Sequence, residues 1–194
     1  MVFLPEEVLA PLRSSMSRHV HSASSSGVVA GGVVNSRVPW KKLNAEWRAG
    51  NRSSLLVVDD VFTPAGLDAL KEYMEDNTMW HSGKLSGYIC AFNDNGFASP
   101  LIAQTTIELQ EALSDVFCDH RLSIVWGYKY PDGDQSDGID KHADYAAVNV
   151  NCWTTSDSTI EPGTGGGMLI WPSKVPQDWI SGGQVMLRCE HISK

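Results

Sequence analysis

The feature that most constrains the fold is a change of hydrophobic period at Arg121. Before this residue, apolar side chains recur at helical spacing. From Leu122 to Tyr130, every second residue is apolar or aromatic. A period of two is typical of a strand with one buried face, because successive strand side chains point to opposite sides. The pattern therefore predicts that helices come first and that a run of short strands follows.

Two helices are predicted from their start signals. Thr63 and Ser99 are each followed by proline, which places a capping hydroxyl before a residue suited to the first helical position. Apolar residues then continue at helical spacing. We expect one helix at about 64–76 and a second, longer one that ends near Cys118.

Short apolar or alternating segments between turn signals predict further strands. They are 55–58 (LLVV), 88–92 (YICAF), a segment containing His142 and Asp144, 146–153 (AAVNVNCW) and 166–171 (GGMLIW). Two helices that brace a sheet, followed by several strands, predict an α+β, mainly β fold. The expected architecture is a jelly roll with supporting N-terminal helices.

The 194 residues suffice for one compact domain, and 42% of them are hydrophobic. Residues 1–53 have weak periodicity, and 14–32 are rich in Ser, Gly and Val. We therefore predict a flexible N-terminal extension over 1–53 and the jelly-roll domain over 54–194. An organellar transit peptide is the alternative for the first residues, although Glu6 and Glu7 are atypical of one.

Charge and cysteine content bear on partners and location. The formal net charge of -8 disfavours nucleic acid as a partner. No apolar run approaches the length of about 20 residues that spans a membrane. The four cysteines are scattered without a CxxC pair, which is typical of reduced thiols in an intracellular, cytoplasmic protein. The oligomeric state is not predicted.

His142 and Asp144 form the motif that points to chemistry. They are separated by one residue, so in a strand an imidazole and a carboxylate point to the same side. Non-haem Fe(II) oxygenases hold their metal with two His and one carboxylate on one face. HxD alone is weak, because it also occurs as a surface His beside an acid. The alternating strand before it and the Asn-rich and Gly-rich segments after it strengthen the metal interpretation.

The stretch from Leu122 to Trp179 resembles the 2-oxoglutarate/Fe(II)-dependent oxygenase superfamily, in its prolyl-hydroxylase-like branch. The similarity is carried by GIDKHADYAAVNVNCWTT and then GTGGGMLIW. The resemblance implies a double-stranded β-helix (jelly roll) and His142 and Asp144 as iron ligands. It also implies Fe(II) as cofactor and 2-oxoglutarate as co-substrate.

The same resemblance implies further site residues. Tyr130, with Tyr128 as second choice, is expected to lie near the co-substrate. Asn151 is expected to face the same pocket. In this family a second His ligand follows on a later strand, and then an Arg or Lys that pairs with 2-oxoglutarate. Here His191 is the one later histidine, and its alternative reading is a tail residue without a metal role.

Arg188 and Lys194 are candidate carboxylate partners by default. We therefore expect a chain that is incomplete at its C-terminus. Two functions stay open. One is a dioxygenase that hydroxylates a C–H bond of an unidentified substrate. The other is a non-catalytic, truncated jelly-roll or cupin-like binding module.

Overall fold

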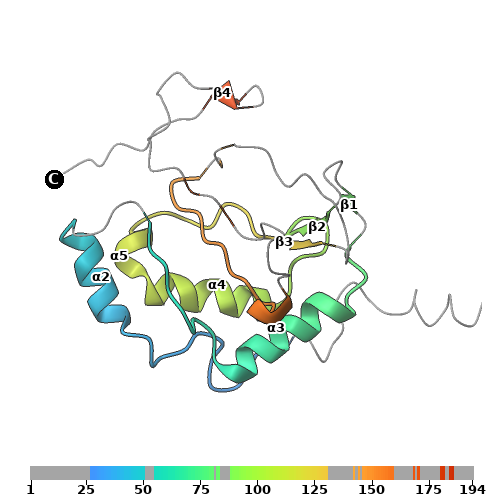
Figure 1. Cartoon of the computed structure of the whole chain (residues 1–194), viewed down its shortest axis with the longest axis horizontal. Helices are drawn as coiled ribbons and strands as arrows, with labels where there is room; N and C mark the ends of the chain where they lie inside the picture. Colours follow the sequence, from blue (N-terminus) through green and yellow to red (C-terminus); the bar gives the residue numbers. More distant parts are fainter. Residues whose placement is uncertain are drawn as a thin grey trace, which may run out of the picture. The chain divides into compact units, whose positions relative to one another are not determined.

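A computed structural model describes residues 27–50, 55–80, 82–83, 88–130, 142, 144, 146–159, 168, 170, 180–181 and 184–185 (Figure 1). The chain forms two compact units, Met1–Ser136 and Asp137–Lys194. In the first, α2 (Trp40–Arg48), α3 (Pro64–Asp76), α4 (Pro100–Ala112) and α5 (Ser114–Phe117) accompany a three-stranded sheet. None of the described helices is long and apolar enough to cross a membrane.

Helix α3 begins where its start signal predicts. The Thr63 hydroxyl accepts a hydrogen bond from the Gly66 amide at 3.0 Å, and Pro64 is the first helical residue. This bond satisfies one of the amides that a helix start leaves unpaired. Leu70 and Tyr73 are buried on the inner face. The predicted helix over 64–76 is confirmed.

Helix α4 uses the same device. The Ser99 hydroxyl accepts from the Ile102 amide at 3.2 Å, and Pro100 follows. The helix breaks at Leu113, continues as α5, and ends where Cys118 has a positive φ of 47°. The predicted second helix ending near Cys118 is confirmed, with one break.

The sheet consists of β1 (Ser82–Gly83), β2 (Ile89–Phe92) and β3 (Trp126–Lys129), in that order and antiparallel. Cys90 pairs with Tyr128, and Phe92 pairs with Trp126. The predicted strand at 88–92 is confirmed. The strand predicted from the alternation of 122–130 is confirmed for 126–129 only, because Leu122 and Ile124 are exposed and unpaired in the sheet.

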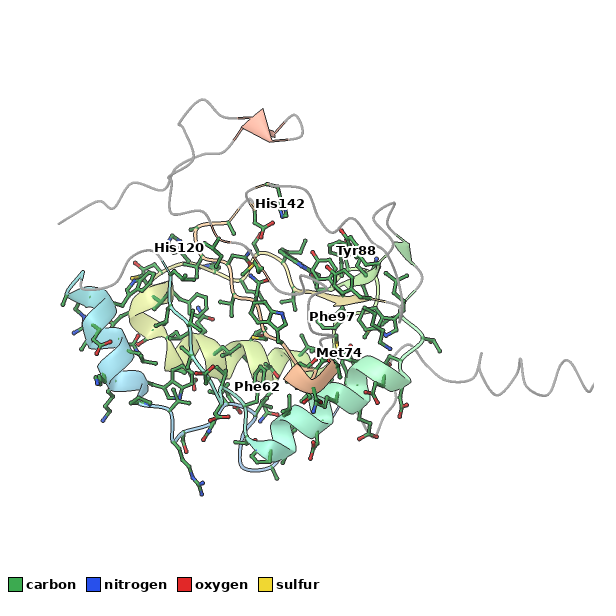
Figure 2. The ribbon with its side chains drawn as sticks, in the orientation of Figure 1. Phe62, Met74, Tyr88, Phe97, His120 and His142 are labelled. Carbon is green, nitrogen blue, oxygen red and sulfur yellow. The ribbon has the colours of Figure 1, made fainter. Side chains whose placement is uncertain are left out.

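One face of the sheet packs on the helices. Ala91 and Gly127 are opposite each other, and a Cβ on Gly127 would lie 2.6 Å from the Phe97 ring. This close approach explains the glycine. Figures 1 and 2 show α3 and α4 on one side of β2 and β3, with Phe97 in this layer. The buried cluster comprises Val33, Leu70, Tyr73, Met79, Ala91, Phe97, Leu101 and Ile102.

Part of the predicted extension belongs to this core. Val33 is fully buried, and the Glu108 carboxylate accepts the Val33 and Val34 amides, each at 2.7 Å. The backbone of Val29 is bonded in both directions by the side-chain amide of Gln104. Residues 27–50 are therefore packed, and a flexible extension over the whole of 1–53 is wrong for them. Residues 1–26 lie outside the described residues.

Helix α2 is attached by a buried amide. The Asn44 side chain donates to the carbonyls of Trp40 and Ala112, at 2.8 and 2.7 Å, and accepts the Asp115 amide at 2.9 Å. Arg48 also forms an ion pair with Asp115. These contacts join α2 to the junction between α4 and α5.

The strand predicted at 55–58 is wrong. These residues are assigned to no strand, and the side chains of Leu55 and Val57 are exposed. These residues are apolar, but no strand in the part of the chain that the structure describes pairs with them. The sheet of this unit forms instead from 82–83, 89–92 and 126–129.

The described part of the second unit contains η1 (Asp157–Thr159) and a pair of two-residue strands, β4 (Ile180–Ser181) and β5 (Gln184–Val185). His142, Asp144 and residues 146–153 belong to no strand, so the strands predicted there are wrong. Met168 and Ile170, predicted within a further strand, are exposed and also belong to none. The jelly roll as a whole stays a prediction.

Candidate metal site

His142 and Asp144 come together in the second unit. The His142 Nε2 atom lies 3.3 Å from the Asp144 Oδ1 atom, and the side chains are 45% and 33% exposed. Figure 2 labels His142. The i, i+2 spacing was expected to bring these groups together on a strand, and they meet here without one. Both remain accessible to an incoming ion.

The loop after Asp144 organises its carboxylate. The Asp144 carbonyl accepts the Ala146 amide at 2.9 Å, and residues 147 and 148 bend. The chain thereby turns back towards Asp144, and the Asn149 side-chain amide donates a hydrogen bond to Asp144 Oδ2. The two carboxylate oxygens therefore have different partners, since Oδ1 faces His142 and Oδ2 faces Asn149.

The donor set suits a divalent transition metal. Imidazole nitrogen and carboxylate oxygen are the ligands of the non-haem iron triad. Two ligands at right angles, each about 2.1 Å from a metal, lie roughly 3.0 Å apart. The observed 3.3 Å between Nε2 and Oδ1 is close to this value. The same separation is that of a direct ion pair between His142 and Asp144, so a metal would enter between two side chains that already contact each other.

A third ligand is not found among the described residues. They contain no group of three or more His, Cys, Asp or Glu side chains that could hold a metal. His191, Arg188 and Lys194, the candidates from the sequence, lie outside the described residues, as do the aspartates of the loop at 131–140.

The side chain of Asn151 contacts a methionine. It was expected to face the co-substrate. Its side-chain amide lies 3.8 Å from the Met168 sulfur, a weak acceptor, and it is exposed. A sulfur contact of this kind holds an amide loosely. Its role towards a co-substrate stays a prediction.

Tyr130 belongs to the first unit and ends a row of aromatic rings on the sheet face opposite Phe97. Its ring centroid lies 5.5 Å from that of Tyr88, which in turn lies 5.3 Å from that of Tyr128. Trp126 continues the row, 6.3 Å from Tyr128. Burial raises the pKa of Tyr130, and Tyr88 adds to the shift. The Tyr130 phenol is therefore a hydrogen-bond donor at neutral pH.

Sequence reasoning found the His142 and Asp144 pair but missed Asn149. The period-two pattern placed Asn149 and Asn151 together on one strand face. Since 146–153 forms no strand, alternation does not govern this segment, and a turn brings Asn149 to Asp144 instead. The sequence signal for this contact is the position of Asn149, a side-chain donor five residues after Asp144.

Comparisons with protein-family models, with curated proteins and with solved structures gave no match.

Proposed function

We propose that this protein is an Fe(II)- and 2-oxoglutarate-dependent dioxygenase that hydroxylates a C–H bond of its substrate. The observation that carries the proposal is the approach of His142 Nε2 to Asp144 Oδ1, at 3.3 Å. An imidazole and a carboxylate in this arrangement supply two of the three protein ligands of the non-haem iron site. When bound, Fe(II) and 2-oxoglutarate supply the oxidising chemistry, which consumes O2 and yields succinate and CO2.

The proposal gives each residue a task. His142 offers a neutral nitrogen donor, and Asp144 offers a negative oxygen donor that offsets part of the metal's charge. Asn151, in the same unit as His142 and Asp144, carries a hydrogen-bond donor suited to a carboxylate co-substrate. The role of Tyr130 stays a prediction from the sequence. The third protein ligand is assigned to His191, the one histidine that follows Asp144.

A binding module without catalysis is the second candidate. It is favoured by the presence of two, rather than three, clustered ligands among the described residues. A pair of ligands holds a metal less tightly than a complete triad does. Metal binding without turnover of 2-oxoglutarate would then be expected.

Anaerobic titration of the full chain with Fe(II) tests the proposal. With 2-oxoglutarate present, we expect a weak visible charge-transfer band that neither compound produces alone. The variants His142→Ala and Asp144→Ala should abolish it. His120→Ala, which removes an exposed histidine of the first unit, is the matched control and should keep it. A band of equal strength in wild type and His142→Ala would refute the assignment.

We also propose that the protein works in an intracellular, reducing compartment. Cys90, Cys118 and Cys152 are free thiols in the described part of the chain. Free thiols persist where glutathione keeps them reduced. The net charge of -8 supports a small-molecule or peptidyl substrate over nucleic acid.

A further inference from the structure

The two oxygens of the Asp144 carboxylate contact different side chains. Its Oδ2 atom accepts a hydrogen bond from the Asn149 side-chain amide, and its Oδ1 atom lies 3.3 Å from His142 Nε2. We propose that Asn149 is a positioning residue, which fixes Asp144 so that Oδ1 alone is presented as a metal ligand. This inference rests on the function proposed above and deepens it.

The need for such a residue follows from the freedom of an aspartate. The terminal torsion of Asp is broad and roughly two-fold, so an unrestrained carboxylate samples many orientations. It can then meet a cation with one oxygen, with both, or with neither. A donor on Oδ2 selects one orientation and occupies that oxygen. The orientation selected here is the one in which Oδ1 faces the imidazole.

Asn149 suits this task by its chemistry. A neutral amide donates to the carboxylate without adding charge, so the negative charge of Asp144 remains available to a metal. A Lys or Arg at the same place would neutralise that charge and compete with the cation. Residues that orient metal ligands in this way typically change metal affinity 10- to 100-fold, by order of magnitude, when they are removed.

A structural role is the competing explanation. Asn149 also closes the turn that starts with the bond from the Ala146 amide to the Asp144 carbonyl, at 2.9 Å. If closing the turn were its only task, its removal would loosen the loop and change stability alone. The two roles therefore predict different readouts, namely metal affinity for positioning and the unfolding midpoint of the metal-free chain for turn closure.

The test is a titration of the full chain with Co(II), whose visible absorption reports coordination by protein ligands. Asn149→Ala removes the side chain, and Asn149→Leu removes the donor while keeping its approximate size. Val150→Ala, at the adjacent and exposed position, is the matched control. His142→Ala is titrated in parallel, and unfolding of each metal-free variant is followed by circular dichroism.

We expect both Asn149 variants to raise the dissociation constant for Co(II) about 10- to 100-fold, with the metal-free unfolding midpoint unchanged. Val150→Ala should bind as the wild type does. If the Asn149 variants bind Co(II) with unchanged affinity while His142→Ala does not bind, positioning by Asn149 is wrong and the proposed metal site stands. A lowered midpoint that accounts for the weaker binding likewise overturns positioning in favour of turn closure. If His142→Ala and wild type bind alike, the proposed function fails as well.

Discussion

The hydrogen bonds described within each unit join residues at different separations in the sequence. In the first, the Glu108 side chain bonds to the backbone of Val33, 75 residues away, and Asn44 bonds to Ala112, 68 residues away. In the described part of the second, Asp144 bonds to Asn149, 5 residues away. The fold of the first unit thus depends on remote partners, and the candidate site depends on neighbours.

This difference explains why a short motif identifies the site more easily than the fold around it. Contacts between near neighbours are set largely by spacing and turns, which can be read locally. Contacts between remote segments form only when a core brings them together, and a cooperative core also stabilises them more strongly.

Amide hydrogen exchange should give the largest contrast. Amides of β2 and β3 lie in a paired sheet, whereas residues 146–153 are in no strand and are mostly exposed. A core amide exchanges through global opening, which for a stability of about 5 kcal/mol or more means roughly a thousandfold slowing or greater. Mass spectrometry of peptides from both segments measures this. Comparable protection of 146–153 would show that the second segment is held by a core of its own.

Truncating an aromatic side chain should lower the free energy of unfolding much more in the first unit than in the second. Phe97 is 5% exposed, and its ring packs edge-on against Tyr73, with centroids 5.8 Å apart. Phe97→Ala should lower the free energy of unfolding by about 3–5 kcal/mol, because it removes buried area and leaves a cavity. Trp153→Ala, at a position 61% exposed, should change it by less than about 0.5 kcal/mol.

Urea unfolding of both variants measures the difference. A large loss for Trp153→Ala would place this tryptophan in a core and would break the contrast between the units. The interpretation of 146–153 as a segment governed by local turns would then fail.

What the sequence could and could not predict follows the same division. The starts of α3 and α4 were predictable because a helix cap is a local contact. In α3, the Thr63 hydroxyl accepts a hydrogen bond from the amide of Gly66, three residues later. The packing of residues 27–50 was not, because Glu108 gives no sign in the sequence that its carboxylate will bind the Val33 amide. The strand at 55–58 was predicted from apolar character alone, without knowledge of a covering partner.

For the site, the pairing of His142 with Asp144 was predictable from their spacing, even though the strand invoked to explain it is not there. The contact of Asn149 with Asp144 was not predictable in this way. The period-two pattern predicted a strand face for the Asn149 side chain, but the chain bends at 147 and 148 and forms no strand there. Local reading thus succeeded for two side chains separated by one residue and failed once the chain turned.

Asn44 tests the remote bonds of the first unit with a smaller expected effect. Its buried amide pairs with the Ala112 carbonyl and the Asp115 amide. Asn44→Ala leaves both groups without their partner and should cost about 1–3 kcal/mol of unfolding free energy. Asn44→Asp keeps the acceptor but sets a carboxylate against the Ala112 carbonyl, so it should not restore stability. Recovery of wild-type stability by Asn44→Asp would mean that the donated bond is dispensable.

The smallest expected effect is a pH dependence at Glu108. Desolvation by burial raises the pKa of this carboxyl, but hydrogen bonds from the Val34 amide, the Gln104 side chain and the Val33 amide outweigh it, so the pKa lies below its ordinary value. A carboxyl with a lowered pKa in the folded state stabilises the protein above its unfolded pKa, and this stabilisation is lost as the pH falls through the folded pKa.

Glu108→Gln should therefore be less stable than the wild type at pH 7, by about 1.5 kcal/mol, the lower end for hydrogen bonds to a charged group that is partly exposed. Below the unfolded pKa of about 4.3 the difference should shrink, because the wild-type carboxyl becomes protonated and resembles the amide. Urea unfolding of both proteins at several pH values measures this. A constant difference across the range would show that the shape of the side chain, and not its charge, attaches residues 33 and 34 to α4, and the contrast between the units would then depend on packing alone.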